Sequence, residues 1–321
     1  MLCTREAPAK CDFLKTPLPT FAQKFFVSLR LKAHLAALTV NLIYGANFSI
    51  AKQVMPEFIK PFGFIIARVL PATVLFFAVS LLYPKEKILA RDKWKLLACA
   101  LFGVAINQML FFKGLSLTHP LNGALIMTTN PVLVLLLATV FLNEKISWNK
   151  IAGIIMALAG AATLILFGKS FSVNDTTVLG DTFIFINSLS FAIFIIIVKP
   201  MMMRYNAITI TKWVFFFGSF MVLPFGYSEF AAVQWHAFSL KIWLCVLFVV
   251  IGVTFVAYTL NIYALRALSA STVSAYIYLQ PVFTTVIAFI ISGVTPHALH
   301  GIAAALIFTG VYLVSKKNAE S

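Results

Sequence analysis

Residues Gly114–Phe167 read GLSLTHPLNGALIMTTNPVLVLLLATVFLNEKISWNKIAGIIMALAGAATLILF. Two apolar spans are separated here by a short polar break, Asn143–Lys150. Pro131 stands near the middle of the first span. A proline there removes one backbone hydrogen bond, to the carbonyl of Met127, and bends the helix. The stretch therefore predicts a pair of apolar helices, the first of them bent near its centre.

The same order of parts returns 150 positions later, in Ala264–Val314. Gln280 and Pro281 stand there in the places of Asn130 and Pro131. Strict identity between the two stretches is low. What recurs is the sequence of features: a helix start rich in small residues, an amide–proline pair, an apolar run, a break and a glycine-bearing second span. We interpret this recurrence as an internal repeat.

The composition indicates a membrane protein. Hydrophobic residues make up 61% of the chain and charged residues 11%, and apolar area on this scale is buried only in a bilayer. The formal charge of +15 does not indicate nucleic-acid binding, because the basic residues lie almost wholly between the apolar runs. The four cysteines show no metal-binding spacing, and we expect no cofactor and no metal.

Ten apolar segments have the length of about 17–25 residues that a hydrocarbon layer about 30 Å thick requires. They are Ala33–Ala51, Phe62–Tyr83, Leu96–Phe112, Leu121–Leu142, Ile151–Gly168, Val178–Val198, Thr211–Tyr227, Ile242–Tyr263, Thr272–Ser292 and Ala298–Ser315. The predicted fold class is an all-α polytopic membrane protein of ten transmembrane helices.

Lys and Arg residues concentrate in alternate connections between these spans. The Tyr83–Leu96 loop alone holds five of them, and Lys145, Arg204 and Lys316 lie in later connections of the same set. The positive-inside rule then predicts that both termini are cytoplasmic, in a bacterial-type inner (plasma) membrane.

The spans divide into five and five. We predict a basic N-terminal arm at residues 1–32, one five-helix repeat at 33–168, a second at 178–315 and a short tail at 316–321. The arm lacks the apolar core of a signal peptide. Because five is odd, the second repeat enters the membrane in the opposite orientation, and such inverted repeats place a substrate site near the bilayer midplane.

Four segments carry a resemblance to a known family. They are IYGANFSIAK (Ile43–Lys52), ARVLPATVLFF (Ala67–Phe77), NPVLVLLLATVFLNEKISWNKIAGIIMALAG (Asn130–Gly160) and ALRALSASTVSAYIYLQPVFTTVIAFI (Ala264–Ile290). Together they resemble the EamA-type transporters of the drug/metabolite transporter superfamily. The resemblance implies ten helices, cytoplasmic termini, and export or exchange of small metabolites, often amino acids, through a central cavity.

One departure from the family pattern concerns Glu144. Family members usually carry an acidic residue after the second proline-containing span as well, but here the aligned stretch Ser292–Thr295 has none. Glu144 is interpreted as an interfacial ion pair with Lys145, Lys150 or a neighbouring loop in preference to a gate or proton site. The reason is that no acidic residue lies clearly within the hydrocarbon depth.

Arg68 is the most informative candidate for a binding site. It lies about six residues into the second span, among aliphatic neighbours, where a guanidinium is costly unless it is paired or hydrated. It could bind a substrate carboxylate or phosphate, whose geometry its planar fork matches. Alternatively, it could extend to the outer headgroups.

The other candidates are polar or aromatic side chains inside apolar spans. They are Asn47, Asn107, Gln108, Thr128, Asn130, Trp213, Thr254, Tyr258, Asn261, Tyr276 and Gln280. Thr254, Tyr258 and Asn261 form one stripe at helical spacing. Such groups either line a cavity or satisfy other helices and the carbonyls that the prolines free.

These features favour a secondary transporter, most simply an exporter, of a small organic metabolite such as an amino acid. An enzyme is not expected, since no catalytic dyad or nucleotide-binding motif is present. Two alternatives are a carrier of nucleotide-sugar or phosphorylated-sugar type and a non-transporting membrane scaffold. The expected partners are a small-molecule substrate and the lipid bilayer, without nucleic acid. Small-residue faces such as Gly153, Ala157 and Gly160 serve helix packing or a homodimer.

Overall fold

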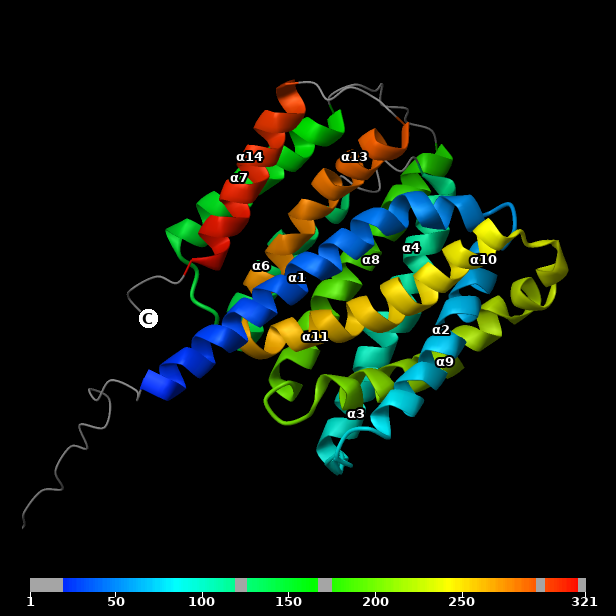
Figure 1. The fold of residues 1–321 in the computed structure, drawn as a ribbon, viewed down its shortest axis with the longest axis horizontal. Helices are drawn as coiled ribbons and strands as arrows, with labels where there is room; N and C mark the ends of the chain where they lie inside the picture. The colour runs from blue at the N-terminus through cyan, green and yellow to red at the C-terminus, as the bar shows by residue number, and fades with distance from the viewer. Residues whose placement is uncertain (1–19, 119–125, 167–174, 293–297, 317–321) are drawn as a thin grey trace, which may run out of the picture.

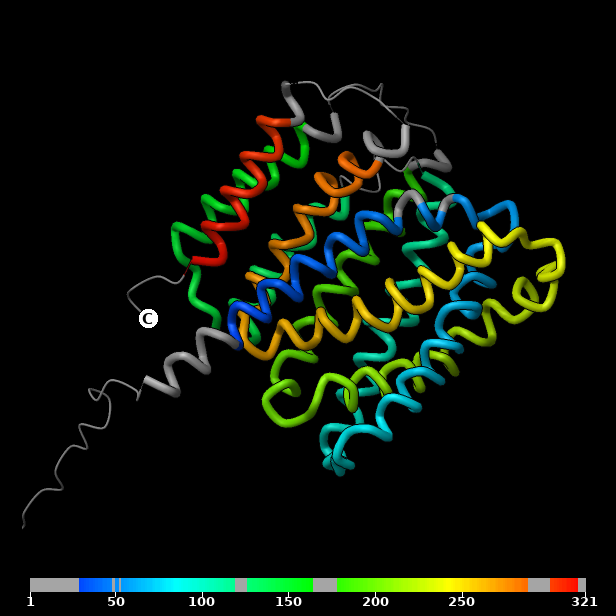
Figure 2. The backbone as a smooth tube through the Cα atoms, in the orientation of Figure 1, coloured from blue at the N-terminus to red at the C-terminus, as the bar shows by residue number. Residues whose placement is uncertain are grey.

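The computed structural model describes residues 20–118, 126–166, 175–292 and 298–316, and these are helical with short connections and contain no strand (Figures 1 and 2). The helices are α1 (Thr20–Val54), α2 (Pro61–Ser80), α3 (Ala90–Ala100), α4 (Ile106–Leu117), α6 (Asn130–Leu142), α7 (Trp148–Leu166), α8 (Asp175–Met201), α9 (Ala207–Ala231), α10 (Leu240–Leu247), α11 (Ala257–Ala267), α12 (Ala270–Ala275), α13 (Leu279–Ser292) and α14 (Ala298–Ser315). Short π-helical or 3-10 segments are Leu101–Ala105, Trp235–Ala237, Phe248–Val256 and Tyr276–Tyr278.

Each of the ten predicted spans falls on one helix or on consecutive helical segments, so the all-α fold class is confirmed. The beginning of the fourth span, before residue 126, and the end of the fifth, after residue 166, lie outside the described residues. Among the described residues, five helical stretches are long and apolar enough to cross a bilayer by themselves: Pro61–Ser80, Ala90–Leu117, Val178–Met201, Ala207–Ala231 and Leu240–Ala267.

The proline-containing spans are broken rather than bent. Pro131 lies in the first turn of α6, after a turn at Thr128 and Thr129, and Pro281 lies in the first turn of α13, after the 3-10 segment Tyr276–Tyr278. The expected mid-helix bend is therefore corrected to a helix start. The first turn suits proline, because its missing N–H has no intrahelical partner there.

A second feature appears at matching places in the two halves, α1–α7 and α8–α14. The third span of each half contains a π-helical segment, Leu101–Ala105 in the first and Phe248–Val256 in the second. Hydroxyl groups bond to carbonyls within these segments: Tyr258 Oη donates to Gly103 O at 3.1 Å, and Thr254 Oγ1 donates to Val249 O at 2.7 Å. Such segments are frequent at functional sites.

The two halves also cap each other's helices. Glu229, near the end of α9, accepts hydrogen bonds from the backbone N–H groups of Phe62 and Gly63 at 2.8 and 2.9 Å, at the start of α2. Glu86, which follows α2, accepts the N–H of Asn206, the residue that caps α9, at 2.9 Å. A carboxylate at a helix N-terminus is favourable. This reciprocal pair is the local signature of an inverted repeat.

Helices α7 and α14 lie side by side although they are far apart in the sequence (Figure 1). A Cβ atom built on Gly310 would lie 2.4 Å from Gly153 O, and one built on Gly160 would lie 2.7 Å from Ala303 O. Glycine is required at such points because the two backbones are in contact. The small-residue face of α7 therefore packs on α14 within the chain, whereas a Cβ atom built on Gly301, at the start of α14, would meet nothing within 4 Å.

Candidate functional site

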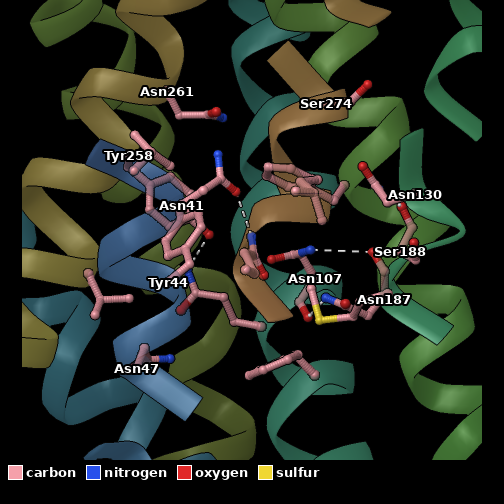
Figure 3. A pocket seen from close by; sticks show the side chains of 18 of the residues that line it. Asn41, Tyr44, Asn47, Asn107, Asn130, Asn187, Ser188, Tyr258, Asn261 and Ser274 are labelled. Atoms are coloured by element: carbon pink, nitrogen blue, oxygen red, sulfur yellow. Dashed lines mark hydrogen bonds between the residues drawn. The ribbon is translucent and has the colours of Figure 1, made fainter. Parts of the chain in front are cut away.

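A cavity of about 90 Å³ lies between the two halves (Figure 3), and we call it the polar cavity because amide, hydroxyl and guanidinium groups line it together with apolar side chains. Its walls come from α1, α2, α4 and α6 of the first half and from α8, α11, α12 and α13 of the second. Most of the predicted site residues line it, namely Asn47, Arg68, Asn107, Gln108, Asn130, Tyr258, Asn261 and Gln280.

Arg68 is buried, with 4% of its surface exposed. Its Nε donates to Thr254 Oγ1 at 2.9 Å, and its guanidinium carbon lies 5.1 Å from the centre of the Phe112 ring. Because α2 begins at Pro61, Arg68 lies about two turns inside the helix. The alternative in which Arg68 extends to the headgroups is therefore wrong for this structure: the guanidinium is held inside the bundle, beside the cavity.

Gln108 and Tyr258 lie at repeat-equivalent positions and bond to each other across the cavity wall. Gln108 Nε2 donates to Tyr258 Oη at 3.1 Å, and the tyrosine hydroxyl donates in turn to Gly103 O. A second pair is reciprocal: Asn107 Nδ2 donates to Asn187 O at 3.3 Å, and Asn187 Nδ2 donates to Asn107 O at 2.6 Å. These bonds hold the amide groups of Asn107 and Gln108 to the second half, through the Asn187 backbone and the Tyr258 side chain.

The two amides that precede the prolines each reach another helix. Asn130 Nδ2 donates to Ser188 O at 2.7 Å. Gln280 Nε2 donates to Asn41 Oδ1 at 2.8 Å, and Asn41 Nδ2 donates to Ala37 O at 2.7 Å. The broken helices therefore present their starts to the cavity, with one amide from each half.

Several buried oxygens around the cavity have no hydrogen-bond partner within the described part of the chain. They are Asn47 Oδ1, Gln108 Oε1, Asn130 Oδ1 and Ser188 Oγ. In Gln108 and Asn130 the amide nitrogen is already engaged, so the oxygen is the group left over. A buried polar atom without a partner is costly, and these acceptors would be satisfied by N–H or O–H donors of a bound molecule or by water.

Four predicted residues do not line the cavity. Thr254 lies behind it and holds Arg68, whereas Trp213 stacks on Phe217 with ring centres 5.9 Å apart. Thr128 lies in the turn before α6, and Tyr276 lies in a 3-10 segment with its hydroxyl 2.7 Å from His34 Nδ1. Met127 and Ile277, each one residue away from an expected position, line the cavity in their place. One residue turns a helix by about 100°, which is enough to reverse such an assignment.

Sequence reasoning missed other polar lining residues, namely Asn41, Tyr44, Asn187, Ser188 and Ser274. Asn41 and Asn187 lie in the first span of their respective halves, 146 positions apart. An alignment of the halves that allowed for loops of unequal length would have paired them.

Glu144 lies away from the cavity, between α6 and α7. It forms the expected ion pair with Lys150, whose Nζ donates to Oε2 at 3.2 Å. It also accepts hydrogen bonds from Ala270 N at 2.8 Å and Ser271 Oγ at 2.6 Å, at the start of α12. Burial raises the pKa of this carboxyl, but the Ser271 hydroxyl, the Lys150 charge and the Ala270 N–H outweigh burial and lower the pKa below its ordinary value.

Metal binding has no support in the described part of the chain, where no three His, Cys, Asp or Glu side chains gather. The cavity offers one guanidinium, several amides and tyrosine hydroxyls, with no carboxylate among its described lining residues. Guanidinium, amide and hydroxyl groups of this kind can form hydrogen bonds with a polar organic molecule.

A helical bundle of two inverted halves around a central polar cavity defines a membrane transporter. Residues 31–166 and 178–316 match the EamA-like transporter family, and the chain belongs to that family. It is an integral membrane protein of the EamA type in the drug/metabolite transporter superfamily.

Similar proteins carry transporter names. An "Uncharacterized transporter" of Archaeoglobus fulgidus is 26% identical over 89% of this chain and 98% of its own length. A "Probable terminal-alkyne amino-acid exporter" of Streptantibioticus cattleyicolor is 27% identical over 71% of this chain and 75% of its own. A solved crystal structure has the same fold, with a TM-score of 0.72 and 19% identity over 88% of this chain and 97% of the other.

Proposed function

We propose that this transporter exports a small zwitterionic metabolite, an amino acid or a close relative, by alternating access around the central cavity. The transporter would lie in an inner (plasma) membrane with both termini in the cytoplasm, as the distribution of Lys and Arg favours. The substrate and the bilayer would be its partners, and a homodimer stays a prediction.

The observation that carries the proposal is the buried charge of Arg68. Only its Nε has a hydrogen-bond partner in the described part of the chain, which leaves the two terminal nitrogens of the fork available. No carboxylate among the described lining residues balances the charge. A buried cation is expensive without a counter-charge, and a bidentate carboxylate is the partner that a guanidinium fork fits best.

The unpartnered oxygens support an ammonium group as the second charged group of the substrate. Asn47, Gln108 and Asn130 each offer an amide oxygen that accepts no hydrogen bond from the described residues. An ammonium group is a donor of three hydrogen bonds and has no acceptor, so it complements such a set. Arg68 for the carboxylate and amide oxygens for the ammonium group together describe an α-amino acid.

The relative from Streptantibioticus cattleyicolor, which is named a probable exporter of an amino acid, agrees with this substrate class and direction. The described lining holds a single cationic side chain, which disfavours a carrier of nucleotide sugars or sugar phosphates. A non-transporting scaffold would not need a polar cavity with unpartnered acceptors.

The test is binding and transport with Arg68→Met, which keeps the length of the side chain and removes the charge. Purified protein would be screened by thermal shift against amino acids, amines, nucleosides and organic acids, and hits would be followed as radiolabelled counterflow in proteoliposomes. We expect amino acids to stabilise the wild type and Arg68→Met to lose both responses.

The matched control is Lys212→Met, since Lys212 lies between the Phe77 and Trp213 rings and outside the cavity. This variant should bind and transport like the wild type. The proposal fails if only amines or nucleosides stabilise the protein, or if Arg68→Met, folded normally, keeps the amino-acid response. If carboxylates without an amino group stabilise the protein equally well, Arg68 binds the carboxylate as proposed, but the amide oxygens do not bind an ammonium group.

A further inference from the structure

Two cavities adjoin at one end of the bundle, away from the polar cavity. The first, the basic pocket, has a volume of about 820 Å³ and is formed by the α6–α7 loop, the turn between α11 and α12, part of α1 and the end of α14. The second, the apolar groove, has a volume of about 410 Å³ and lies between α1, α13 and α14. His34, Ser315 and Lys316 line both, so the two cavities lie directly next to each other.

The basic pocket carries an uncompensated positive charge. Arg30, Lys145, Lys150 and Lys316 line it, together with a single carboxylate, that of Glu144. Glu144 already accepts hydrogen bonds from Lys150 and from the start of α12. Within the described ranges, Arg30, Lys145 and Lys316 form no ion pair. Three cations without an ion-pair partner among the described residues surround one pocket and are complementary to an anion such as a phosphate group.

The apolar groove has the character of a lipid-facing surface. Leu35, Leu38, Leu279, Phe308, Val311 and Tyr312 line it. Leu35, Phe308 and Tyr312 are exposed by 53%, 49% and 63%, as expected of side chains that contact hydrocarbon. Phe308 lies seven residues before Ser315, the last residue of α14, so the groove extends roughly 10 Å along the helix from the basic pocket.

The level of the basic pocket is that of a membrane surface. Trp148, at the start of α7, lines the pocket and is exposed by 83%. Tryptophan is enriched at the boundary between headgroups and hydrocarbon. A charged pocket at that level, joined to an apolar groove that runs deeper, matches the two parts of a phospholipid.

We propose that the basic pocket and the apolar groove together form a binding site for one anionic phospholipid. Its phosphate lies among Arg30, Lys145 and Lys316, and one acyl chain lies along α1 and α14. A soluble phosphate compound would use the pocket alone, whereas the phospholipid uses both cavities. Because α1 and the α6–α7 loop belong to the first half and α12 and α14 to the second, the bound lipid bridges the two halves at this end.

The experiment uses the full chain purified in a nonionic detergent, with native mass spectrometry to count bound lipid and thermal unfolding to measure apparent affinity. The probes are phosphatidylglycerol, phosphatidylcholine with identical acyl chains, and glycerol 1-phosphate. We expect one phosphatidylglycerol to bind and stabilise the wild type, and the other two probes to have no comparable effect.

Variants test each part of the site. The triple variant Arg30→Gln, Lys145→Gln, Lys316→Gln should raise the half-saturating phosphatidylglycerol concentration by about tenfold or more. The control variant Lys85→Gln, Lys87→Gln, Lys93→Gln removes the same amount of charge from exposed positions between α2 and α3 and at the start of α3. These positions lie outside the basic pocket, so the half-saturating concentration should stay unchanged.

The groove is tested separately. Leu38→Trp should obstruct the apolar groove, whereas Leu42→Trp, one turn further along α1 and outside the groove, should not.

Three results would overturn the proposal. Equal stabilisation by the two phospholipids would mean that the cations of the basic pocket do not select an anionic headgroup. Equal losses in the two triple variants would mean that only the overall surface charge attracts the lipid. Competition by glycerol 1-phosphate, with Leu38→Trp behaving like the wild type, would assign the pocket to a soluble phosphate compound. None of these readouts depends on Arg68 or on the transported substrate.

Discussion

Arg68 shows how a single residue connects the two halves. Its guanidinium stands on α2 in the first half, and its one described hydrogen bond goes to Thr254, which lies 186 positions away in the second half. The Thr254 hydroxyl donates its own hydrogen to Val249 O at 2.7 Å, so its oxygen is left to accept from the arginine. Thr254 is therefore a positioning residue that orients the fork toward the cavity.

Replacing Thr254 by valine should test this positioning role. Valine preserves the shape of the side chain and leaves Arg68 Nε–H without an acceptor, which costs about 1–3 kcal/mol for a buried donor. We expect Thr254→Val to unfold at a lower temperature and to weaken binding of any ligand that requires Arg68. Thr254→Ser keeps the hydroxyl and should retain both properties. Equal behaviour of the two variants would mean that the hydrogen bond does not orient the arginine.

At the scale of elements, the break between α6 and α7 is tied to another helix start. Glu144 joins the end of α6 in the first half to Ala270 and Ser271, at the beginning of α12 in the second. Asn143 makes this geometry available because it ends α6 in the left-handed conformation, at φ 52°. The carboxylate is thus a connection between halves at the end of the bundle where the basic pocket lies.

The charge of Glu144 should make stability depend on pH. Since the pKa of Glu144 is lower in the folded protein than its ordinary value, its contribution is present above the unfolded pKa. The contribution is lost as the pH falls through the folded pKa, which lies below the ordinary value of a glutamate side chain. Glu144→Gln should lower the unfolding free energy at neutral pH by about 1–3 kcal/mol.

The measurement is thermal unfolding of wild type and variants between neutral and acidic pH. Glu144→Gln should lose part of the acid sensitivity, and Glu57→Gln, an exposed carboxylate at another connection, should match the wild type. If the wild type and Glu144→Gln show the same stability at neutral pH, the connection contributes nothing to folding.

The α7–α14 pair depends on glycine at the point where the backbones touch. An added methyl group at Gly310 would lie 2.4 Å from Gly153 O and 2.7 Å from the Ala157 Cβ. Gly310→Ala should therefore force the helices apart and cost about 1–3 kcal/mol, the usual range for overpacking. Gly301→Ala, on the same helix with nothing within 4 Å, should be neutral or slightly stabilising. The measurement is the unfolding temperature of each variant in detergent. An equal decrease for Gly310→Ala and Gly301→Ala would contradict the packing argument.

At the scale of the whole molecule, the inverted repeat places equivalent parts opposite each other. Gln108 and Tyr258 bond to each other, and Asn130 and Gln280 both line the cavity. At one end, Asp92 on α3 forms an ion pair with Arg204 at 3.1 Å, which again joins the first half to the second. Under the proposed alternating access, this ion pair and the Glu144 contacts would separate when that end opens.

The proposed orientation has a direct test in cells. In a variant with the native cysteines replaced by serine, single cysteines would be placed at Lys85, between α2 and α3, and at Gln234, between α9 and α10. A membrane-impermeant maleimide should label Gln234→Cys in intact cells, and should label Lys85→Cys only after the cells are opened. The opposite pattern would reverse the proposed topology.

The sequence by itself determined the helical class, the places of the spans, the repeat and the two proline positions at which a span departs from a straight helix. These features are local: an apolar run has to be buried in hydrocarbon, and Pro131 and Pro281 cannot donate a backbone hydrogen bond. The burial cost of a guanidinium likewise made Arg68 a candidate before any contact was known.

Only the tertiary structure decided which side chains face the cavity and what they contact. The rotation of a helix about its axis is set by the helices packed against it, so Met127 lines the cavity where Thr128 was expected. Long-range pairing made Thr254 the partner of Arg68 and removed Trp213 from the site. The two proline-containing spans are divided, and Pro131 and Pro281 lie in the first turns of α6 and α13, where the missing N–H needs no intrahelical partner.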